Sequence, residues 1–413
     1  MSEAVYPNDW QERRLTGLAN YHNGLAFKPA DWSEDGVRII RIEQLNNPEG
    51  DYDHFNGFFP DANAINDGDL IFSWSATLKV SIWRYGKAVL NQHLFKVVPK
   101  SGFDKSYLYF LLDFHMDALS AGSHGSTMKH IKRGELEKYS VRLPSQREQE
   151  KIVEVLATID SAIEKTEALI AKYQQIKAGL MHDLFTRGVT ADGKLRPPRE
   201  QAPELYQETP IGWIPKEWEA PQIGDVFDIQ LGKMLNKLAK TGKGVAPYLG
   251  NRAVQWDFID SLAIEEMDFS SSEREKFSLV PGDLLVCEGG DVGRTAMWRG
   301  ELESCYFQKA IHRLRPKSDR AMPAFMLRFM RFAKENGYFR EFTSQSSIAH
   351  LTQEKLSAIP MLLPKPDEQK RIAERFEAMD RLIQNEQSNL YKFHQKKLGL
   401  MYDLLTGKVR VQQ

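Results

Sequence analysis

The residue types that usually carry catalysis are few in this sequence and do not fall at catalytic spacings. Its two cysteines, Cys287 and Cys305, form no Cys-x-x-Cys pair, and its ten histidines include no His-Glu-x-x-His zinc motif. Residues 242–244, Gly-Lys-Gly, lack the upstream glycine and the trailing Ser or Thr of a phosphate-binding loop. The sequence also has no Asn/Asp-Pro-Pro-Tyr/Phe motif of an amino-methyltransferase. We therefore predict that this chain has no catalytic centre and no metal site.

Two segments resemble sites but are better explained by structure. Residues 289–293, Gly-Gly-Asp-Val-Gly, lack the glycine spacing of a dinucleotide fingerprint and predict a tight turn after a strand at 284–287. Cys287 ends that strand without a neighbouring histidine, so a core position is favoured over a nucleophile. Residues 366–370 look like a nuclease triad, but the related segment 146–150 has arginine in place of the aspartate. Both segments lie at predicted helix starts, which indicates helix caps.

Basic and amide side chains gather in residues 232–252, a segment without an acidic residue. Lys and Arg supply most of the affinity of proteins for nucleic-acid phosphates. A solvated surface loop is the alternative, but the amide and aromatic groups beside the charges favour phosphate contact. The candidate residues are Lys233, Asn236, Lys237, Lys240, Lys243, Tyr248, Asn251 and Arg252.

Other polar residues lie where turns and strands could present them to base edges. Residues 38–47 alternate as a strand with one polar face, for which an edge strand facing water is an equally good interpretation. Arg and Lys suit guanine, whereas Asn and Gln suit adenine. The candidates in the first half are Arg38, Arg41, Gln44, Ser73, Ser75, Thr77, Lys79, Gln92, His93, Ser126 and Lys129. Those in the second half are Glu288, Asp291, Arg294, Gln308, Lys309, Gln345, Ser346 and Ser347.

The elements that must position these residues come from an internal duplication. Residues 143–189 align without gaps with residues 363–409, so each residue of the first copy matches the one 220 positions later. His130 and His350 fall at matching positions just before these copies, which favours a structural or phosphate-directed role over base reading. Two unrelated bundle helices are the alternative to a duplication, and the gapless match argues against them.

Both copies predict long helices that form a coiled coil. Apolar residues recur with 4-3-4-3 spacing, from Ile152, Leu156, Ile159 and Ile163 in the first copy and from Ile372, Phe376, Met379 and Ile383 in the second. About 35 helical residues would span on the order of 50 Å. Ser145 with Glu148 is typical of a capping box, and Pro366 suits a first helical turn. We expect the two helices to pack against each other in antiparallel orientation.

The globular parts repeat more weakly. Residues 9–24 match residues 217–232, and a Gly-Asp-Leu strand start occurs at 68–70 and at 282–284. Gln92 and Gln308 follow in similar β-rich settings. The predicted organisation is a globular domain at 1–143, a long helix at 144–187, a Pro- and Gly-rich linker at 188–215, a second globular domain at 216–363, and a second long helix with a tail at 364–413.

With these features the sequence resembles type I restriction-modification specificity subunits. The resemblance rests on LPSQREQEKIVEVLATID, LPKPDEQKRI, ETPIGWIPKEW, CEGGDVGR, FQKAIHRLRP and the ending DLLTGKVRV, in this order across both halves. The first half departs from it, because residues 74–77, Trp-Ser-Ala-Thr, replace the glycine turn. The resemblance implies an α+β chain in which two pseudo-symmetric α/β target-recognition domains are separated by two long helices forming an antiparallel coiled coil.

The same resemblance implies a non-catalytic subunit that recognises a bipartite, asymmetric target in double-stranded DNA. It implies that two modification subunits dock on the helices and bring S-adenosylmethionine for adenine methylation. Restriction subunits would bring ATP-driven translocation and magnesium-dependent cleavage, so no cofactor is expected in this chain. A scaffold that binds two copies of a protein partner without touching DNA is the second hypothesis, and an enzyme with an unrecognised site is the third.

Composition limits the remaining possibilities. The chain has 413 residues, 42% of them hydrophobic, which is enough for more than one core. With 55 basic and 56 acidic residues its net charge is -1, so any nucleic-acid surface must be local rather than global. We find no membrane span and no signal peptide, and two cysteines suit a reducing compartment. We therefore expect a cytoplasmic protein with no membrane partner.

Overall fold

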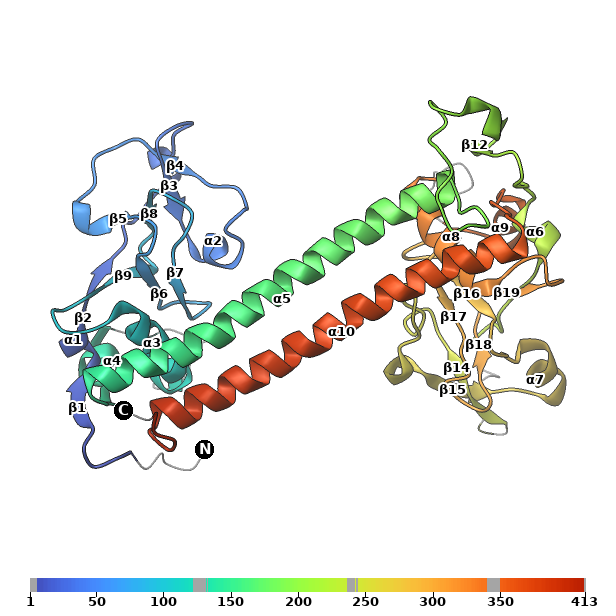
Figure 1. The fold of residues 1–413 in the computed structure, drawn as a ribbon. Helices are drawn as coiled ribbons and strands as arrows, with labels where there is room; N and C mark the ends of the chain where they lie inside the picture. Colours follow the sequence, from blue (N-terminus) through green and yellow to red (C-terminus); the bar gives the residue numbers. More distant parts are fainter. Residues whose placement is uncertain are drawn as a thin grey trace. The chain divides into compact units, whose positions relative to one another are not determined.

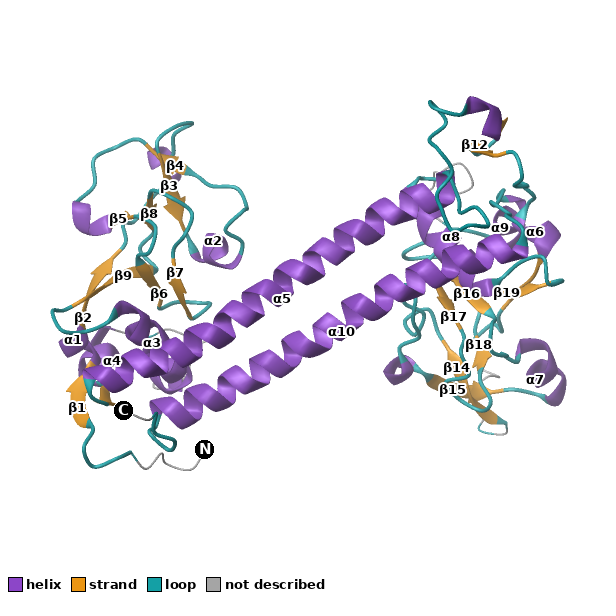
Figure 2. Ribbon diagram, in the orientation of Figure 1, coloured by secondary structure: helices purple, strands orange, loops and turns teal. Residues whose placement is uncertain are grey.

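The computed structural model describes residues 6–121, 131, 133–235, 242, 244–339 and 350–411. The chain divides into two compact units, residues 1–168 with 387–413 and residues 169–386, so the division falls within both long helices (Figure 1). Each unit combines one globular α/β domain with parts of the two helices. Strands are confined to the globular domains, whereas the long segments are wholly helical (Figure 2). The predicted α+β class is confirmed.

The first unit contains an antiparallel sheet of order β2-β9-β6-β7 and a mixed sheet of order β4-β3-β8-β5. Its strands are β1 (Gln11–Arg14), β2 (Ala19–Asn23), β3 (Val37–Ile40), β4 (His54–Phe55), β5 (Ala64–Ile65), β6 (Leu70–Ser73), β7 (Lys79–Ile82), β8 (Ala88–Leu90), β9 (Leu94–Pro99) and β10 (Ser140–Leu143). Its shorter helices are α1 (Leu15–Leu18), α2 (Ile42–Asn46), α3 (Lys105–Ala121) and α4 (Arg133–Lys138).

The second unit repeats this plan with sheets of order β13-β19-β16-β17 and β15-β14-β18. Its strands are β11 (Tyr206–Thr209), β12 (Gly212–Pro215), β13 (Phe227–Leu231), β14 (Val245–Leu249), β15 (Glu265–Asp268), β16 (Leu284–Cys287), β17 (Thr295–Met297), β18 (Tyr306–Phe307) and β19 (Ile311–Pro316). Its shorter helices are α6 (Ile223–Val226), α7 (Ser271–Phe277), α8 (Pro323–Glu335) and α9 (Gln353–Ala358).

The Gly-Asp-Leu segments begin equivalent strands, β6 and β16, as predicted. Gly68 and Gly282 have φ values of 86° and 97°, in the left-handed region that glycine adopts at little cost. The carboxylates of Asp69 and Asp283 each accept a 2.8 Å hydrogen bond from the backbone N–H three residues earlier. Both turns therefore close in the same way before the strand begins.

The long helices are α5 (Gln146–Thr186) and α10 (Pro366–Leu405). In the first unit Asp160 lies 2.8 Å from Lys397, and in the second unit Lys177 lies 2.6 Å from Asp380. Asp160 matches Asp380, and Lys177 matches Lys397, at the spacing of the repeat. The two ion pairs are thus repeat equivalents, and within each unit the helices run antiparallel.

The seam predicted from the 4-3 spacing faces the interior of each unit. Ile152 and Leu156 of α5 are buried in the core of the first unit, where they join Leu404 and Leu405 near the end of α10. Ile372 and Phe376 of α10 are buried in the core of the second unit. Each globular core therefore receives the beginning of one long helix and the end of the other.

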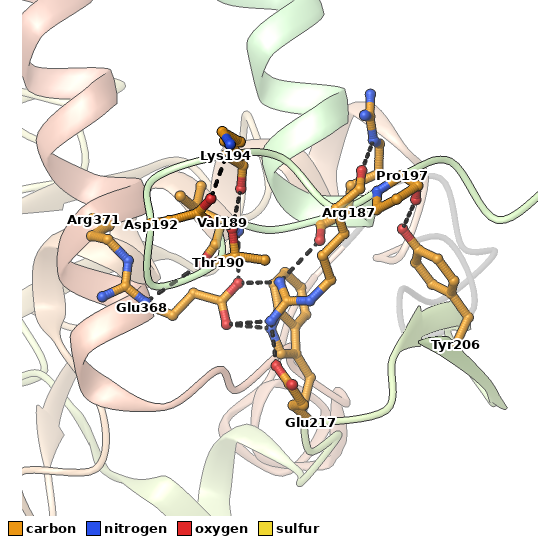
Figure 3. A network of polar contacts seen from close by, with 12 residues as sticks. Arg187, Val189, Thr190, Asp192, Lys194, Pro197, Tyr206, Glu217, Glu368 and Arg371 are labelled. Atoms are coloured by element: carbon orange, nitrogen blue, oxygen red, sulfur yellow. Dashed lines mark hydrogen bonds and ion pairs between the residues drawn. The ribbon is translucent and has the colours of Figure 1, made fainter. Parts of the chain in front are cut away.

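A buried arginine, Arg196, connects the segment after α5 to the beginning of α10, and Figure 3 shows its partners Glu368 and Glu217. Arg196 donates hydrogen bonds to Glu368 at 2.5 and 3.0 Å and also pairs with Glu217. The Glu368 carboxylate further accepts from Trp218 Nε1 at 3.1 Å and from the Val189 backbone N–H at 2.7 Å. The Arg196 and Glu368 side chains are each only 6% exposed, so a buried ion pair holds the first turn of α10 in position.

The first unit contains an equivalent cluster after α10. Arg410 donates to Glu148 at 2.6 and 2.8 Å and to Asp9 at 3.0 Å. Glu148 matches Glu368 in the helical repeat, and Asp9 matches Glu217 in the weaker repeat. We call these two clusters the arginine clasps, one centred on Arg196 and one on Arg410.

The clasps correct part of the helix-cap prediction. Ser145 accepts a hydrogen bond from the backbone N–H of Glu148 at 3.3 Å, as an N-cap should. The Glu148 carboxylate, however, is held by Arg410 rather than closing a capping box. Glu368 likewise binds Arg196, because a long-range guanidinium is a stronger partner than the neighbouring backbone.

The segment predicted as a linker, residues 188–215, is folded into the second unit. It contains the hairpin of β11 and β12, and Ile214 joins the main core of that unit. The Tyr206 hydroxyl donates to the backbone oxygen of Pro197 at 2.6 Å. Its Pro and Gly content therefore reflects turns within a packed structure.

Candidate functional site

In each unit a pair of parallel strands brings two loops to the same edge of a sheet. β14 and β18 pair in parallel through Leu249 and Phe307, and β3 and β8 do so through Ile40 and Leu90. Parallel neighbours end at the same edge, so the chain leaves each pair through two adjacent loops. These segments are residues 250–252 and 308–310 in the second unit; in the first unit they are residue 41, which leads directly into α2 rather than continuing the strand predicted at 38–47, and residues 91–93.

In the second unit the glycine turn after β16 contacts this edge. The Asn251 side-chain amide donates to the backbone oxygen of Gly289 at 3.0 Å. Arg294 donates to the Asn251 side chain at 2.6 Å and to its backbone oxygen at 2.7 Å. Residues predicted from distant parts of the sequence are thus brought together, and the tight turn predicted at 289–293 is confirmed by the positive φ of Gly290 and Gly293.

The same contacts give three of the predicted DNA-contact residues a structural role. Asn251 and Arg294 bind each other, and Asp291 accepts hydrogen bonds from Trp256 at 2.6 Å and Lys334 at 2.9 Å. Burial opposes ionisation of Asp291, but the hydrogen bonds from Lys334 and Trp256 outweigh it and lower the pKa of this carboxyl. These side chains hold the turn in place, which favours a structural role over the predicted contacts with DNA.

Two more predicted contacts in the second unit are internal. Lys233 Nζ donates to the Asp268 backbone oxygen and to Glu273, both at 2.6 Å, and its side chain is 11% exposed. The hydrogen bond from Lys233 lowers the pKa of Glu273. Tyr248 is buried, and its hydroxyl donates to Glu265 at 2.5 Å; burial and this contact raise the pKa of Tyr248 to about 12. These internal partners favour structural roles for both side chains over the predicted phosphate contacts.

Several first-unit candidates are also used inside the fold. Ser73 and Ser75 are buried, and Ser73 donates to the Thr77 backbone oxygen at 2.6 Å. Gln44 is buried and donates to the Asp51 backbone oxygen at 2.8 Å. The Ser73 and Gln44 side chains satisfy backbone groups of nearby residues, and Ser75 is buried, which favours structural roles over the predicted DNA contacts.

Three basic candidates of the first unit are engaged to different degrees. Lys79 Nζ donates to the Leu45 backbone oxygen at 2.6 Å, and Arg41 pairs with Asp53. Arg38 remains exposed, with its guanidinium 5.1 Å from the centre of the Tyr52 ring. Lys79 and Arg41 thus stabilise the loop around α2, whereas Arg38 remains a predicted DNA contact.

Four predicted contacts are exposed: Thr77, Gln92, Arg252 and Lys309. His93, Glu288 and Gln308 are half-buried, and Glu288 is joined through its backbone to Ala310 and Leu351. These seven stay predictions. The remaining candidates lie outside the described residues: Ser126, Lys129, Asn236, Lys237, Lys240, Lys243, Gln345, Ser346 and Ser347.

The structure corrects the register of one matched pair. Modelling a Cβ on Gly24 would place it 2.1 Å from the Asn91 oxygen, and on Gly232 it would lie 2.2 Å from the Gln308 oxygen. Asn91 therefore corresponds to Gln308, and Gln92 corresponds to Lys309. The repeated glycines were visible in the sequence. A difference in loop length between the halves, however, made Gln92 look like the match of Gln308, which is instead matched by Asn91.

The potential nucleophile Cys287 lies in the core, as predicted, and burial raises the pKa of its thiol to about 11. Burial likewise raises the pKa of Cys305, to about 12. Among the described residues no three His, Cys, Asp or Glu side chains are grouped to hold a metal ion. None of the described helices is both long and apolar enough to span a membrane.

Comparison with known proteins identifies relatives over nearly the whole chain. A family model for the type I restriction modification DNA specificity domain matches residues 7–175 and 215–392. The type I restriction enzyme MjaVIII specificity subunit of Methanocaldococcus jannaschii is 23% identical, with 98% of this chain and 94% of that protein covered. The EcoBI specificity subunit of Escherichia coli is 22% identical, with 90% and 79% covered.

Two solved structures share the fold. The crystal structure of a type I restriction-modification S subunit from M. genitalium has a TM-score of 0.58 at 14% identity, covering 98% of this chain and 99% of that one. A chain from a study of complex assembly and conformational transition in the type I R-M system has a TM-score of 0.60 at 16% identity, covering 98% and 100%. The arrangement of duplicated domains and long helices is therefore shared with these proteins.

Proposed function

Because this chain belongs to the type I restriction-modification DNA specificity family, we propose that each of its globular halves reads one part of a bipartite, asymmetric DNA target. The observation that carries this proposal is the duplication itself. Both halves build the same sheet edge, but they present different side chains there, Gln92 in one and Lys309 in the other. Two domains with the same fold but different exposed residues are suited to binding two different DNA sequences.

We further propose that two modification subunits dock on the long helices and that restriction subunits join them. Tyr391 and Leu398 support a docking role, since they lie one heptad apart on α10, outside the seam, and are 67% and 62% exposed. S-adenosylmethionine, ATP and magnesium would be bound by these partners, and the complex would act in the cytoplasm. This chain alone should show no turnover, whereas the complex should methylate adenine.

The test is the salt dependence of binding by the complex of this chain with its modification subunits. A DNA reader that neutralises Z phosphates shows a slope of about −0.9Z in log K against log salt. We expect such a slope, together with preference for one sequence. Binding of partner subunits without salt-dependent, sequence-selective binding of DNA would instead support a protein scaffold.

A further inference from the structure

The two exposed residues Gln92 and Lys309 lie in turns built on the same backbone hydrogen bonds. Leu94 N–H donates to the Asn91 oxygen at 3.0 Å, and Ile311 N–H donates to the Gln308 oxygen at 3.2 Å. Each bond closes a four-residue turn between a strand of the mixed sheet and a strand of the antiparallel sheet. In each turn, 91–94 and 308–311, the exposed residue occupies the second position.

Further hydrogen bonds fix both turns from their flanks. The first residue of each turn donates to the end of the parallel strand, Asn91 to Ile40 at 2.9 Å and Gln308 to Leu249 at 3.1 Å. The last residue of each turn accepts from a glycine N–H, at 2.9 Å from Gly24 to Leu94 and at 3.1 Å from Gly232 to Ile311. The same set of hydrogen bonds therefore holds both turns, although the third residue has a positive φ only in the second turn, at Ala310.

The side chains at the second positions of both turns are exposed. Among the described residues neither the Gln92 side chain nor the Lys309 side chain has a hydrogen-bond or ion-pair partner. Lys309 is followed by Ala310 at φ 95°, a conformation that is uncommon outside glycine. Such strain persists where the surroundings impose it and is frequent at binding sites.

From this equivalence we propose that Gln92 and Lys309 occupy the same base-reading position in the two parts of the target. Glutamine can bind adenine through N6 and N7, and lysine donates to O6 and N7 of guanine. Gln92 therefore selects adenine at one position in one part, and Lys309 selects guanine at one position in the other. This inference rests on the proposed function and assigns the chemistry of one position in each part.

The experiment exchanges the two residues in the full chain, co-expressed with its partner subunits. The variants are Gln92→Lys, Lys309→Gln and both together, and the readout is the methylated motif mapped in genomic DNA. We expect Gln92→Lys to change adenine to guanine at one position of one part, by roughly ten-fold in relative methylation or more. Lys309→Gln should make the opposite change in the other part, and Gln92→Ala should relax the first position to any base.

Matched controls make the same changes at exposed positions outside the turns. Lys216→Gln and Gln201→Lys should leave both parts of the motif unchanged. An unchanged motif in the exchanged variants, or an equal loss of methylation at all sites as for a phosphate contact, overturns the proposal. A wild-type complex that methylates no bipartite motif would instead overturn the proposed function, so the two failures are distinguishable.

Discussion

Two cations near one sheet edge, Lys233 and Arg252, differ in what they contact. Lys233 is held by Glu273 and a backbone oxygen, whereas Arg252 is exposed and has no ion pair among the described side chains. The residue types alone did not separate them. An extended run of basic residues predicts a charged surface, but which charges point outward depends on partners such as Glu273, 40 positions away in sequence.

Arg252 should therefore contribute to DNA affinity through phosphate rather than base contact. We expect Arg252→Ala to weaken binding of the complex to all sequences and to reduce the magnitude of the salt slope by about 1. Arg299→Ala, at another exposed position of the same unit, should leave the slope unchanged. Loss of affinity for only one sequence, with the slope intact, would contradict a phosphate contact.

Arg294 shows how structure changes a residue-scale interpretation. Its position in the glycine turn predicted base reading, yet its guanidinium is bound to Asn251. Arg294→Ala should lower the stability of the second unit, measured by urea unfolding, rather than relax sequence preference. A relaxed motif in a stably folded Arg294→Ala complex would restore the original interpretation.

At the scale of elements, the long helices were predictable because their spacing is a local pattern. The seam from Ile152 onward is visible in the sequence, and its burial follows from it. The arginine clasps were not predicted, since Arg196 is 172 residues from Glu368 in sequence. A sequence signal did exist, because acidic residues stand at matched positions 148 and 368 and again at 9 and 217.

The clasp centred on Arg196 should be a major source of stability for the second unit. Arg196→Ala leaves the buried Glu368 carboxylate without its cation, a change that costs about 3–5 kcal/mol in comparable pairs. Urea unfolding followed by fluorescence measures the effect. Lys194→Ala removes a pair whose lysine is 83% exposed and should change the free energy of unfolding by less than about 1 kcal/mol. Equal effects of the two substitutions would contradict the role of the clasp.

Helix α3 gives the first unit a pH-dependent stability. His115 is 7% exposed, and burial lowers its pKa to about 4. In the unfolded chain the histidine pKa is about 6.5. Between about pH 4 and pH 6.5 the unfolded chain therefore binds a proton at His115 that the folded unit does not bind. Stability present above pH 6.5 is therefore lost as the pH falls toward 4, by on the order of 2–3 kcal/mol.

Urea unfolding of the wild type and of His115→Gln between pH 4 and 7 tests this dependence. The glutamine keeps a polar partner for Tyr139, whose hydroxyl lies 3.0 Å from His115 Nδ1, but it does not titrate. We expect the difference in stability between the two proteins to vary across this range. Parallel pH profiles would show that another group is responsible.

At the scale of the whole molecule, the duplication predicted both the repeated domains and their shared register. It matched Gly232 with Gly24 and Glu368 with Glu148 without any structural information, and the structure gives both pairs equivalent contacts. It did not give the target bases, because residues at equivalent positions differ where they are exposed, as Gln92 and Lys309 do. Such exposed positions carry no packing constraint from which their partners could be inferred.

If the helices set the separation of the two reading domains, their length should set the gap in the target. A seven-residue insertion in the middle of each helix preserves the 4-3 seam and adds about 10 Å of helix. We expect the methylated motif to keep both specific parts while the gap between them widens by one or more base pairs. A motif with an unchanged gap would exclude the helices as the ruler.

The most direct measurement of the central claim is a genome-wide map of methylated adenines in cells that express the modification subunits with and without this chain. The account predicts a motif of two different specific parts with a fixed gap, present only when this chain is expressed. An identical methylation map without the chain, or a motif with a single specific part, would contradict it.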